Sequence, residues 1–276
     1  LDAALNGALA STLKQLGAFL KDPVKAFFNT RLGVYLEREA AESPDHEPFD
    51  LDGLAHWQLQ NELIGAGRRA VEASEPPMPV VDETLARLER EGRLAMGGFA
   101  HRMREDLVAP LDELFAKDAE LLDAWPHARP MPAPVSLSLD ADGGELAVED
   151  WLGELRENDQ GETCRLLLLT SSLINQSKYN WKHWLTPWIE HLAAQIAVGP
   201  MITELRSRAG EGTLYPLPAD EARARLTAIA SAWQAGMTAP LPLARDTAFA
   251  WIEKGGDASG VERYLGDAEN AEETDL

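Results

Sequence analysis

A block of strand-like sequence in the middle of the chain constrains the fold more than any other feature. Val135-Ser136-Leu137-Ser138-Leu139 alternates apolar and polar residues with period two, which is typical of a half-buried strand. Residues 140–144 are rich in Asp and Gly and predict a hairpin turn, with 146–155 as the partner strand. The four leucines at 166–169 predict that 164–170 is a strand buried on both faces. We therefore expect an antiparallel meander in the middle of the chain.

Helical patterns precede this block. Residues 11–20 are amphipathic, and Asp22 followed by Pro23 marks a helix start, since Asp caps free N–H groups and Pro needs none in the first turn. Apolar residues at helical spacing predict further helices from Asp50 to about 64 and from 99 to 115. The N-terminal part is therefore expected to be rich in helices.

Helices also follow the block. Trp181, Trp184 and Trp188 lie at helical spacing in a helix that should run to about 198. A hairpin is expected around 210–212, and then a helix over 220–235 that Gly236 ends. This order predicts an α/β fold of the α+β kind, in which helices flank a central mixed sheet.

The net charge of −21 limits the partners of the chain. Such a surface repels phosphates, so strong independent binding to nucleic acid is not expected, whereas adaptation to salt or a basic protein partner would both explain it. The acidic residues 267–276 are expected to be disordered. The single cysteine, Cys164, is interpreted as a small buried hydrophobe and fits a reducing cytoplasm, and no apolar run is long enough to cross a membrane.

Motifs for cofactors and metals are missing from the sequence. The six histidines are scattered, and neither a Gly-rich phosphate loop nor a nucleophile-elbow motif occurs. We therefore predict no cofactor, no metal site and no catalytic residue.

The order helix, meander, helix suggests one enzyme class for a direct test, the PD-(D/E)xK nucleases. These enzymes hold Mg²⁺ with an Asp on one strand and a D/E-x-K motif on the next. Each of the seven lysines has a non-acidic residue two positions before it, so no D/E-x-K motif exists in this chain. Glu149, Asp150 and Glu154 lie on a predicted strand, and we interpret them as a solvated strand edge.

Basic residues occur in two places that could contact nucleic acid. Lys178, Trp181 and Lys182 mix charge with aromatic surface, as in a stacking platform for single strands. Lys21, Lys25 and Arg31 could contact a phosphate backbone. The alternatives are that the tryptophans form a core or interface stripe and that the basic residues form a solvated helix face.

Several stretches together resemble the RecC C-terminal domain family, part of the gamma subunit of the exodeoxyribonuclease V helicase–nuclease. The resemblance covers most of the chain and rests on segments that occur in the family's order, at 19–24, 28–34, 47–54, 91–99, 188–192, 215–217 and 235–241. Asp22 departs from the pattern, because the family often has His at that position.

The resemblance implies a degenerate PD-(D/E)xK restriction-endonuclease-like fold without nuclease activity. It places Gly153 where an active relative would have its metal-binding Asp. It also implies a domain over 1–266 of a larger subunit, followed by the acidic tail. RecB-like and RecD-like subunits would be its partners, and DNA strands would be guided within that complex.

We therefore expect a non-catalytic, cytoplasmic subunit domain of a helicase–nuclease in double-strand-break repair and homologous recombination. Two alternatives stay open at this point. One is a divergent Mg²⁺-dependent nuclease with migrated catalytic residues, and the other is a protein-interaction domain unrelated to DNA.

Overall fold

The structure, a computed structural model, describes residues 11–34, 53–94, 98–176 and 178–257. The expectations for Asp50 and for the tail 267–276 lie outside these residues. The helices are α1 (Leu13–Lys21), α2 (Pro23–Arg31), α3 (Gly53–Glu72), α4 (Pro77–Arg90), α5 (Gly98–Val108), α6 (Leu111–Ala124), the short 3-10 helix η2 (Trp181–His183), α7 (Leu185–Ala197), α8 (Ala219–Thr238) and α9 (Arg245–Glu253). The strands are β1 (His127–Ala128), β2 (Ala133–Ala141), β3 (Gly144–Leu152), β4 (Leu155–Glu157), β5 (Thr163–Leu169), β6 (Ile174–Asn175), β7 (Lys178–Tyr179), β8 (Ile202–Ser207) and β9 (Glu211–Leu214).

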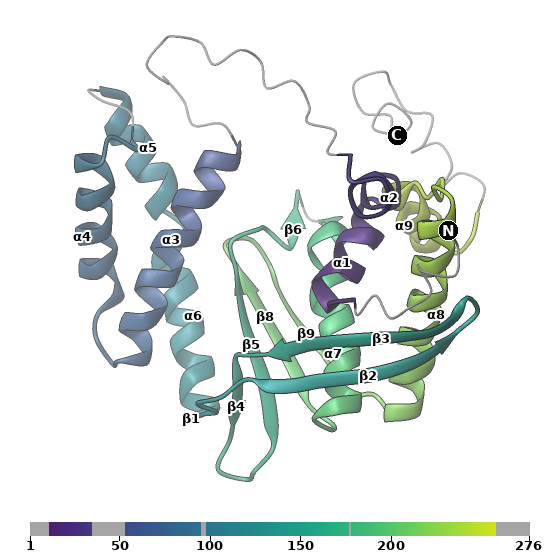
Figure 1. Cartoon of the computed structure of the whole chain (residues 1–276). Helices are drawn as coiled ribbons and strands as arrows, with labels where there is room; N and C mark the ends of the chain where they lie inside the picture. Colours follow the sequence, from purple (N-terminus) through teal and green to yellow (C-terminus); the bar gives the residue numbers. More distant parts are fainter. Residues whose placement is uncertain (1–10, 35–52, 95–97, 177, 258–276) are drawn as a thin grey trace.

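A five-stranded mixed sheet in the order β1-β4-β5-β8-β9 lies at the centre (Figure 1). β5 and β8 are parallel and the other neighbours are antiparallel. A parallel pair needs a crossover connection, and α7 lies within the one that joins β5 to β8. The expected mixed sheet with flanking helices is confirmed, and so is the predicted hairpin of β8 and β9.

Alternate side chains of β5 face two different helical layers. Cys164 and Leu166 pack with Leu122 and Trp125 at the end of α6. Arg165 faces the other way and pairs with Glu190 of α7. The prediction that this strand is covered on both faces is thus confirmed for its first half.

The long hairpin of β2 and β3 is not part of the central sheet but forms a separate two-stranded ribbon. Its turn, Asp142-Gly143, lies where the sequence predicts it, with Ala141 opposite Gly144. The ribbon buries alternate residues of β2 against α7 and α8, and these make the largest hydrophobic core together with α1. The expected single meander is therefore divided, because Glu154 adopts a positive φ of 62° between β3 and β4.

Helices α3 to α6 form a second core of their own, which lies at the left of Figure 1. Arg68 of α3 connects helices α3 to α6 to the central sheet. Its guanidinium pairs with Glu154 (3.0 Å) and donates to the carbonyl oxygen of Leu166 (3.3 Å). The buried Asp118 of α6 lies 3.9 Å from Arg68, and burial raises the pKa of this carboxyl while the arginine opposes the rise.

The helix start at Asp22-Pro23 is confirmed. Asp22 is the N-cap of α2, its side chain accepts from the backbone N–H of Lys25 (2.8 Å), and Pro23 occupies the first turn. Thr12 caps α1 with a reciprocal bond to Gln15, whereas Ser11 is buried in a bridge to Val148 of β3.

Two helix boundaries differ from the predictions. Gly236 does not end a helix, because α8 continues to Thr238 and a Cβ at Gly236 would lie 2.7 Å from Cζ of Phe19. The glycine is needed there for close packing of α8 on α1. The tryptophan helix begins later than expected, because η2 carries Trp181 and α7 starts only at Leu185.

Candidate functional site

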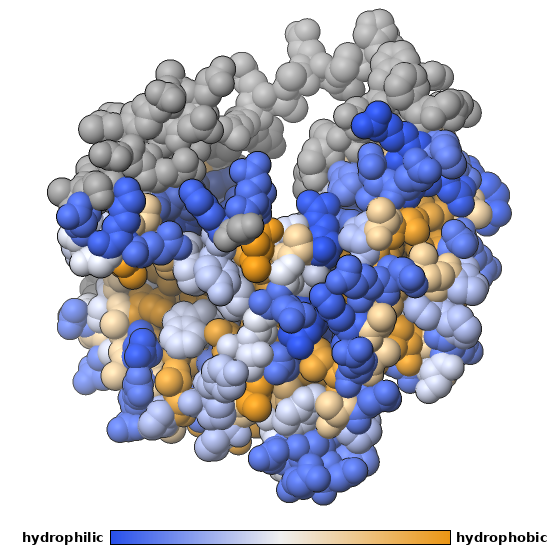
Figure 2. All heavy atoms as spheres, turned by 180° about the vertical axis from the view of Figure 1, so that it is seen from behind, coloured by the Kyte–Doolittle hydropathy of each residue, from blue (hydrophilic) through white to orange (hydrophobic). Residues whose placement is uncertain are grey.

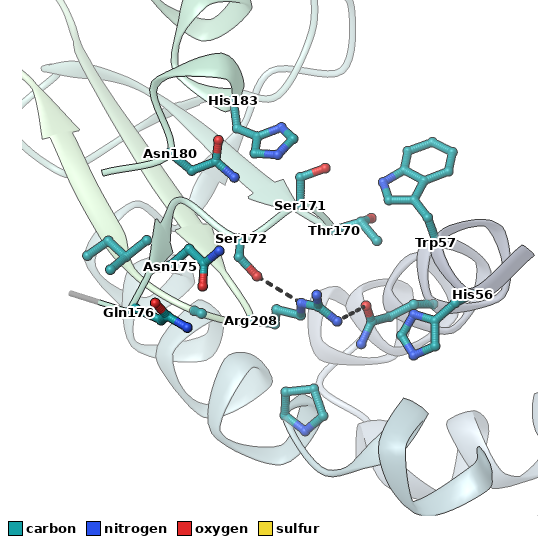
Figure 3. A pocket seen from close by; sticks show the side chains of 14 residues that line it. His56, Trp57, Thr170, Ser171, Ser172, Asn175, Gln176, Asn180, His183 and Arg208 are labelled. Atoms are coloured by element: carbon teal, nitrogen blue, oxygen red, sulfur yellow. Dashed lines mark hydrogen bonds between the residues drawn. The ribbon is translucent and has the colours of Figure 1, made fainter. Parts of the chain in front are cut away.

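A polar cavity of about 680 Å³ lies at the carboxyl ends of the parallel strands β5 and β8. In α/β sheets ligands commonly bind at this edge. Figure 3 shows the side chains that surround it. We call it the amide pocket, and it is lined by His56, Trp57, Gln60, Pro110, Thr170, Ser171, Ser172, Ile174, Asn175, Gln176, Asn180, His183, Arg208 and Ala209.

Arg208, just after the end of β8, connects the walls of the pocket. Its Nε donates to Ser172 Oγ (2.8 Å) in the loop after β5, and its Nη1 donates to Gln60 Oε1 (3.3 Å) on α3. On the same side Thr170 Oγ1 donates to Asn61 Oδ1 (2.8 Å). The N-terminal turns of α3 are thereby held against the edge of the sheet.

Gln60 is 1% exposed, and its side-chain nitrogen has no hydrogen-bond partner within the described ranges. A buried amide N–H₂ group without an acceptor is costly, so such groups are rare in folded proteins. Gln60 therefore presents an unused donor in the wall of the pocket.

His183 lines the pocket and stands next to a group of cations. Burial is the main cause that lowers the pKa of His183 to about 4, and the charges of Lys182, Lys21 and Arg245 lower it further. The imidazole is therefore neutral near pH 7 and can both donate and accept a hydrogen bond.

The cations beside His183 form what we call the basic cluster: Lys14, Lys21, Lys182 and Arg245. Burial and then the charge of Lys182 lower the pKa of Lys21, while Glu190 opposes this. Arg245 donates to the backbone oxygen of Lys21 (2.6 Å), which fixes α9 against the end of α1. The cluster is notable in a chain with a net charge of −21.

The structure brings together some of the residues that the sequence singled out and separates others. Lys21 and Lys182 are neighbours, although 161 positions separate them (182 − 21). Lys25 and Arg31 lie exposed on α2, and Lys178 lies exposed on β7.

The aromatic residues near Lys182 pack mainly on one another. The ring of Trp181 stacks on Phe249 of α9 (centroids 5.1 Å apart, 14° between planes), and its Nε1 donates to Glu253 Oε1 (2.6 Å). Tyr179 and Trp184 flank it at centroid distances of 4.9 and 6.3 Å. These contacts fit the interpretation of the tryptophans as a packing stripe.

An arginine lies beside Gly153, the position that the resemblance assigns to a metal-binding residue. The Nε of Arg165 donates to the carbonyl oxygen of Gly153 (3.1 Å), and its Nη1 pairs with Glu190 (2.8 Å). Both carboxylate oxygens of Asp150 are used, one by the N–H of Leu13 (2.9 Å) and one by that of Trp151 (2.8 Å). Among the residues that the structure describes, no group of three or more His, Cys, Asp or Glu is arranged to hold a metal ion.

Cys164 and His191 have structural surroundings. Burial is the main reason that the pKa of the Cys164 thiol rises to about 12, so the thiol stays protonated and inert. The buried ring of His191 bonds to Thr203 Oγ1 (2.8 Å) and to the carbonyl oxygen of Tyr215 (3.0 Å).

The key residues of the amide pocket were not predicted from the sequence. Trp57, Gln60 and Arg208 come from distant segments, and none of them belongs to a motif. One signal was present: a strand, a helix and another strand in succession favour a parallel pair, and the residues after such strands meet at one edge.

Comparison with known proteins agrees with the sequence resemblance. The model of the RecC C-terminal domain family matches residues 8–256. The RecBCD enzyme subunit RecC of Escherichia coli is 27% identical over 247 residues, which cover 89% of this chain and 20% of that protein. The RecBCD enzyme subunit RecC of Haemophilus influenzae is 42% identical over 52 residues, 19% of this chain and 5% of that protein.

The chain spans about one fifth of the length of the Escherichia coli relative. Among solved structures, the crystal structure of SSO0001 shares 12% identity and a TM-score of 0.30, over 73% of this chain and 85% of that one, a likeness too low to support an argument. No helix in the described part of the chain is long and apolar enough to span a membrane. The family match extends over most of the sequence, and the chain therefore belongs to the RecC C-terminal domain family.

Proposed function

We propose that this chain is a non-catalytic domain of a RecC-like subunit that assembles with RecB-like and RecD-like subunits and guides DNA strands. The observation that carries the proposal is the family match over residues 8–256. Both curated relatives are named as subunits of the RecBCD enzyme. The setting would be double-strand-break repair by homologous recombination in the cytoplasm of a bacterium.

The domain would comprise residues 1–266 and carry a degenerate PD-(D/E)xK-like fold, with 267–276 as an acidic tail. Two features support the fold assignment. β4 and β5 form an antiparallel pair, and β5 continues through α7 into the parallel strand β8. Gly153 lies at the bend between β3 and β4, beside β5, where the resemblance places the metal-binding residue.

The absence of nuclease activity in this domain is proposed on chemical grounds. Mg²⁺ requires oxygen ligands, and the Gly153 carbonyl oxygen accepts a hydrogen bond from the cationic Arg165, which is also paired with Glu190. Asp150 accepts a hydrogen bond from the backbone N–H of Leu13 at the start of α1, and Glu149 is exposed on β3. No D/E-x-K motif supplies the remaining groups.

The enzymatic alternative has a direct test. The purified chain is incubated with linear duplex and single-stranded DNA in the presence of Mg²⁺, and the products are separated on a gel. We expect no cleavage above that of a mock purification. Cleavage that disappears in both Glu149→Gln and Asp150→Asn, but not in a control such as Glu162→Gln on the exposed turn before β5, would show a migrated active site.

The DNA part of the proposal draws on the basic cluster. Lys182 is exposed and forms no ion pair within the described ranges, so its charge is available to a phosphate. Salt-dependent contact with phosphates is the usual contribution of such lysines. The concentration of cations beside His183 on an otherwise acidic chain favours this proposal over a protein-interaction domain unrelated to DNA.

A further inference from the structure

The amide pocket differs in charge from the rest of the molecule. Acidic residues number 46 of 276 in the chain, about one in six, yet none of the 14 residues that line the pocket is acidic. The lining instead offers the side-chain amides of Gln60, Asn175, Gln176 and Asn180, together with hydroxyl groups and Arg208. A ligand of this pocket would be rich in hydrogen-bonding groups and neutral or negative, but not cationic.

Trp57 adds an aromatic wall to this polar surface. It lies on the second turn of α3 and is 43% exposed, although large apolar side chains are normally covered. Figure 3 shows its ring at one side of the opening, across from His183 and above Arg208. Unlike Trp181, it has no stacked aromatic partner in the portion of the chain that the structure covers. Its ring is thus available to stack on a planar ligand.

The donors in the pocket point to a ligand with several acceptors. The unpartnered N–H₂ of Gln60 requires one acceptor. The Nε and Nη1 atoms of Arg208 donate to Ser172 and Gln60. The Nη2 atom of the guanidinium is left to donate to a ligand. The neutral ring of His183 can donate or accept a hydrogen bond.

The basic cluster continues from the pocket through His183. Lys182 directly precedes His183 in the chain, and Lys21 is close enough for its charge to affect the pKa of His183. Figure 2 shows the molecule from behind, with a hollow in its upper surface. A charged chain that left the pocket along His183 would meet Lys182 and Lys21.

We propose that the amide pocket receives one unstacked nucleobase of single-stranded DNA. In this site the ring of Trp57 stacks on the base, and the side-chain amides of the pocket, including that of Gln60, form hydrogen bonds to the edge of the base. The adjoining phosphates lie toward Arg208 and the basic cluster. The volume of about 680 Å³ suits one nucleotide and excludes a duplex. Because every base has a flat face, stacking on one tryptophan tolerates many sequences, as strand guidance requires. This inference rests on the proposed function and adds a specific base site to it.

Photocrosslinking locates the base directly. The full chain is mixed with an oligonucleotide that carries 5-iododeoxyuridine, at about 50 mM salt so that its acidity does not suppress binding. After irradiation, the modified peptide is identified by mass spectrometry. We expect the adduct on Trp57. An adduct confined to other aromatic residues, such as Trp151 or Trp251, would overturn the assignment.

Matched variants measure the contribution of the pocket. Trp57→Ala should weaken binding of the oligonucleotide by roughly 5- to 100-fold, the usual effect of losing one stacked base. Trp151→Ala, which removes another exposed tryptophan from β3, should leave it unchanged. Arg208→Ala should weaken binding more than Arg208→Lys, whereas Arg90→Ala on α4 removes an exposed arginine elsewhere and should have no effect.

Competition separates a strand from a free nucleotide. Unlabelled single-stranded DNA should displace the oligonucleotide, whereas dTMP and duplex DNA should not do so at equal nucleotide concentration. Displacement by dTMP would overturn the proposal that the pocket binds a DNA strand and would indicate a site for a free nucleotide. Binding that is insensitive to Trp57 and Arg208 but lost on substitution of Lys182 would overturn the base site and leave the proposed function standing. Failure of the chain to associate with its partner subunits would instead count against the function.

Discussion

Arg165 of β5 and Glu190 of α7 form an ion pair with an Nη1–Oε2 distance of 2.8 Å, and the two side chains are only 8% and 21% exposed. The same guanidinium bonds to the carbonyl oxygen of Gly153, so one side chain joins the sheet, the crossover helix and the bend after β3. A cation thereby lies beside Gly153, the position that the resemblance assigns to the metal-binding residue of an active relative.

The Arg165–Glu190 pair yields a prediction on stability. Glu190→Leu leaves a nearly buried guanidinium without its partner, and we expect a loss of about 3 kcal/mol in the free energy of unfolding. The double variant Arg165→Met/Glu190→Leu should lose less free energy of unfolding than Glu190→Leu alone, because it leaves no buried charge without a partner. Urea unfolding of the three proteins measures this, and a double variant that is less stable than the single one would contradict it.

A second prediction concerns close packing at a glycine. Gly236→Ala places a methyl group against the ring of Phe19, and we expect a loss of about 1–3 kcal/mol from overpacking. Gly65→Ala in α3 is the matched control, because its Cβ would meet only the flexible end of Arg69 at 3.6 Å. That variant should gain up to about 1 kcal/mol from helix propensity. Equal effects of the two substitutions in thermal unfolding would show that α8 and α1 are not packed this closely.

The neutral state of His183 predicts a pH dependence. Its folded pKa of about 4 lies below the unfolded value of 6.5, so the unfolded chain binds the proton first as the pH falls. The stabilising effect of the neutral ring is complete above pH 6.5 and is lost as the pH falls toward 4.

As the pH falls from 6.5 to 4, the His183→Gln variant should therefore lose less stability than the unmodified chain. Chemical denaturation at several pH values compares them, and an NMR titration reports the pKa of His183 itself. A measured pKa near 6.5 would mean that the ring is neither buried nor beside the basic cluster.

The basic cluster predicts how binding responds to salt. Lys182→Ala should weaken single-stranded DNA binding similarly for all sequences and reduce the salt slope of the affinity by about one. Lys117→Ala serves as the control, because this lysine already pairs with Glu113 (2.9 Å). Fluorescence anisotropy across a salt series gives the slope. Identical slopes for the two variants would exclude phosphate contact by Lys182.

Local features of the fold were predictable from the sequence, and long-range ones were not. Asp22-Pro23 and the Asp142-Gly143 turn follow from a few neighbouring residues, so their structures were predicted correctly. The role of Gly236 depends on Phe19, which is distant in sequence, and the local glycine signal therefore suggested a helix end. The division of the meander depends on the backbone of Glu154, a residue with no glycine-like signal.

The same distinction applies to the site. Lys21 and Lys182 were singled out separately for their local composition, yet only the fold makes them neighbours. Trp181 carried the strongest local signal for stacking, but Phe249 of α9 packs on its ring. Trp57 carried no such signal and is the exposed tryptophan at the pocket, because exposure is decided by tertiary packing.

We propose that this chain is a subunit domain that works within a larger complex. The direct measurement is co-expression of the chain with RecB-like and RecD-like subunits, followed by affinity purification and determination of the mass of the eluted complex. We expect the partner subunits to co-purify with the chain in a defined stoichiometry. Recovery of the chain alone, under conditions in which those subunits are folded and soluble, would contradict it.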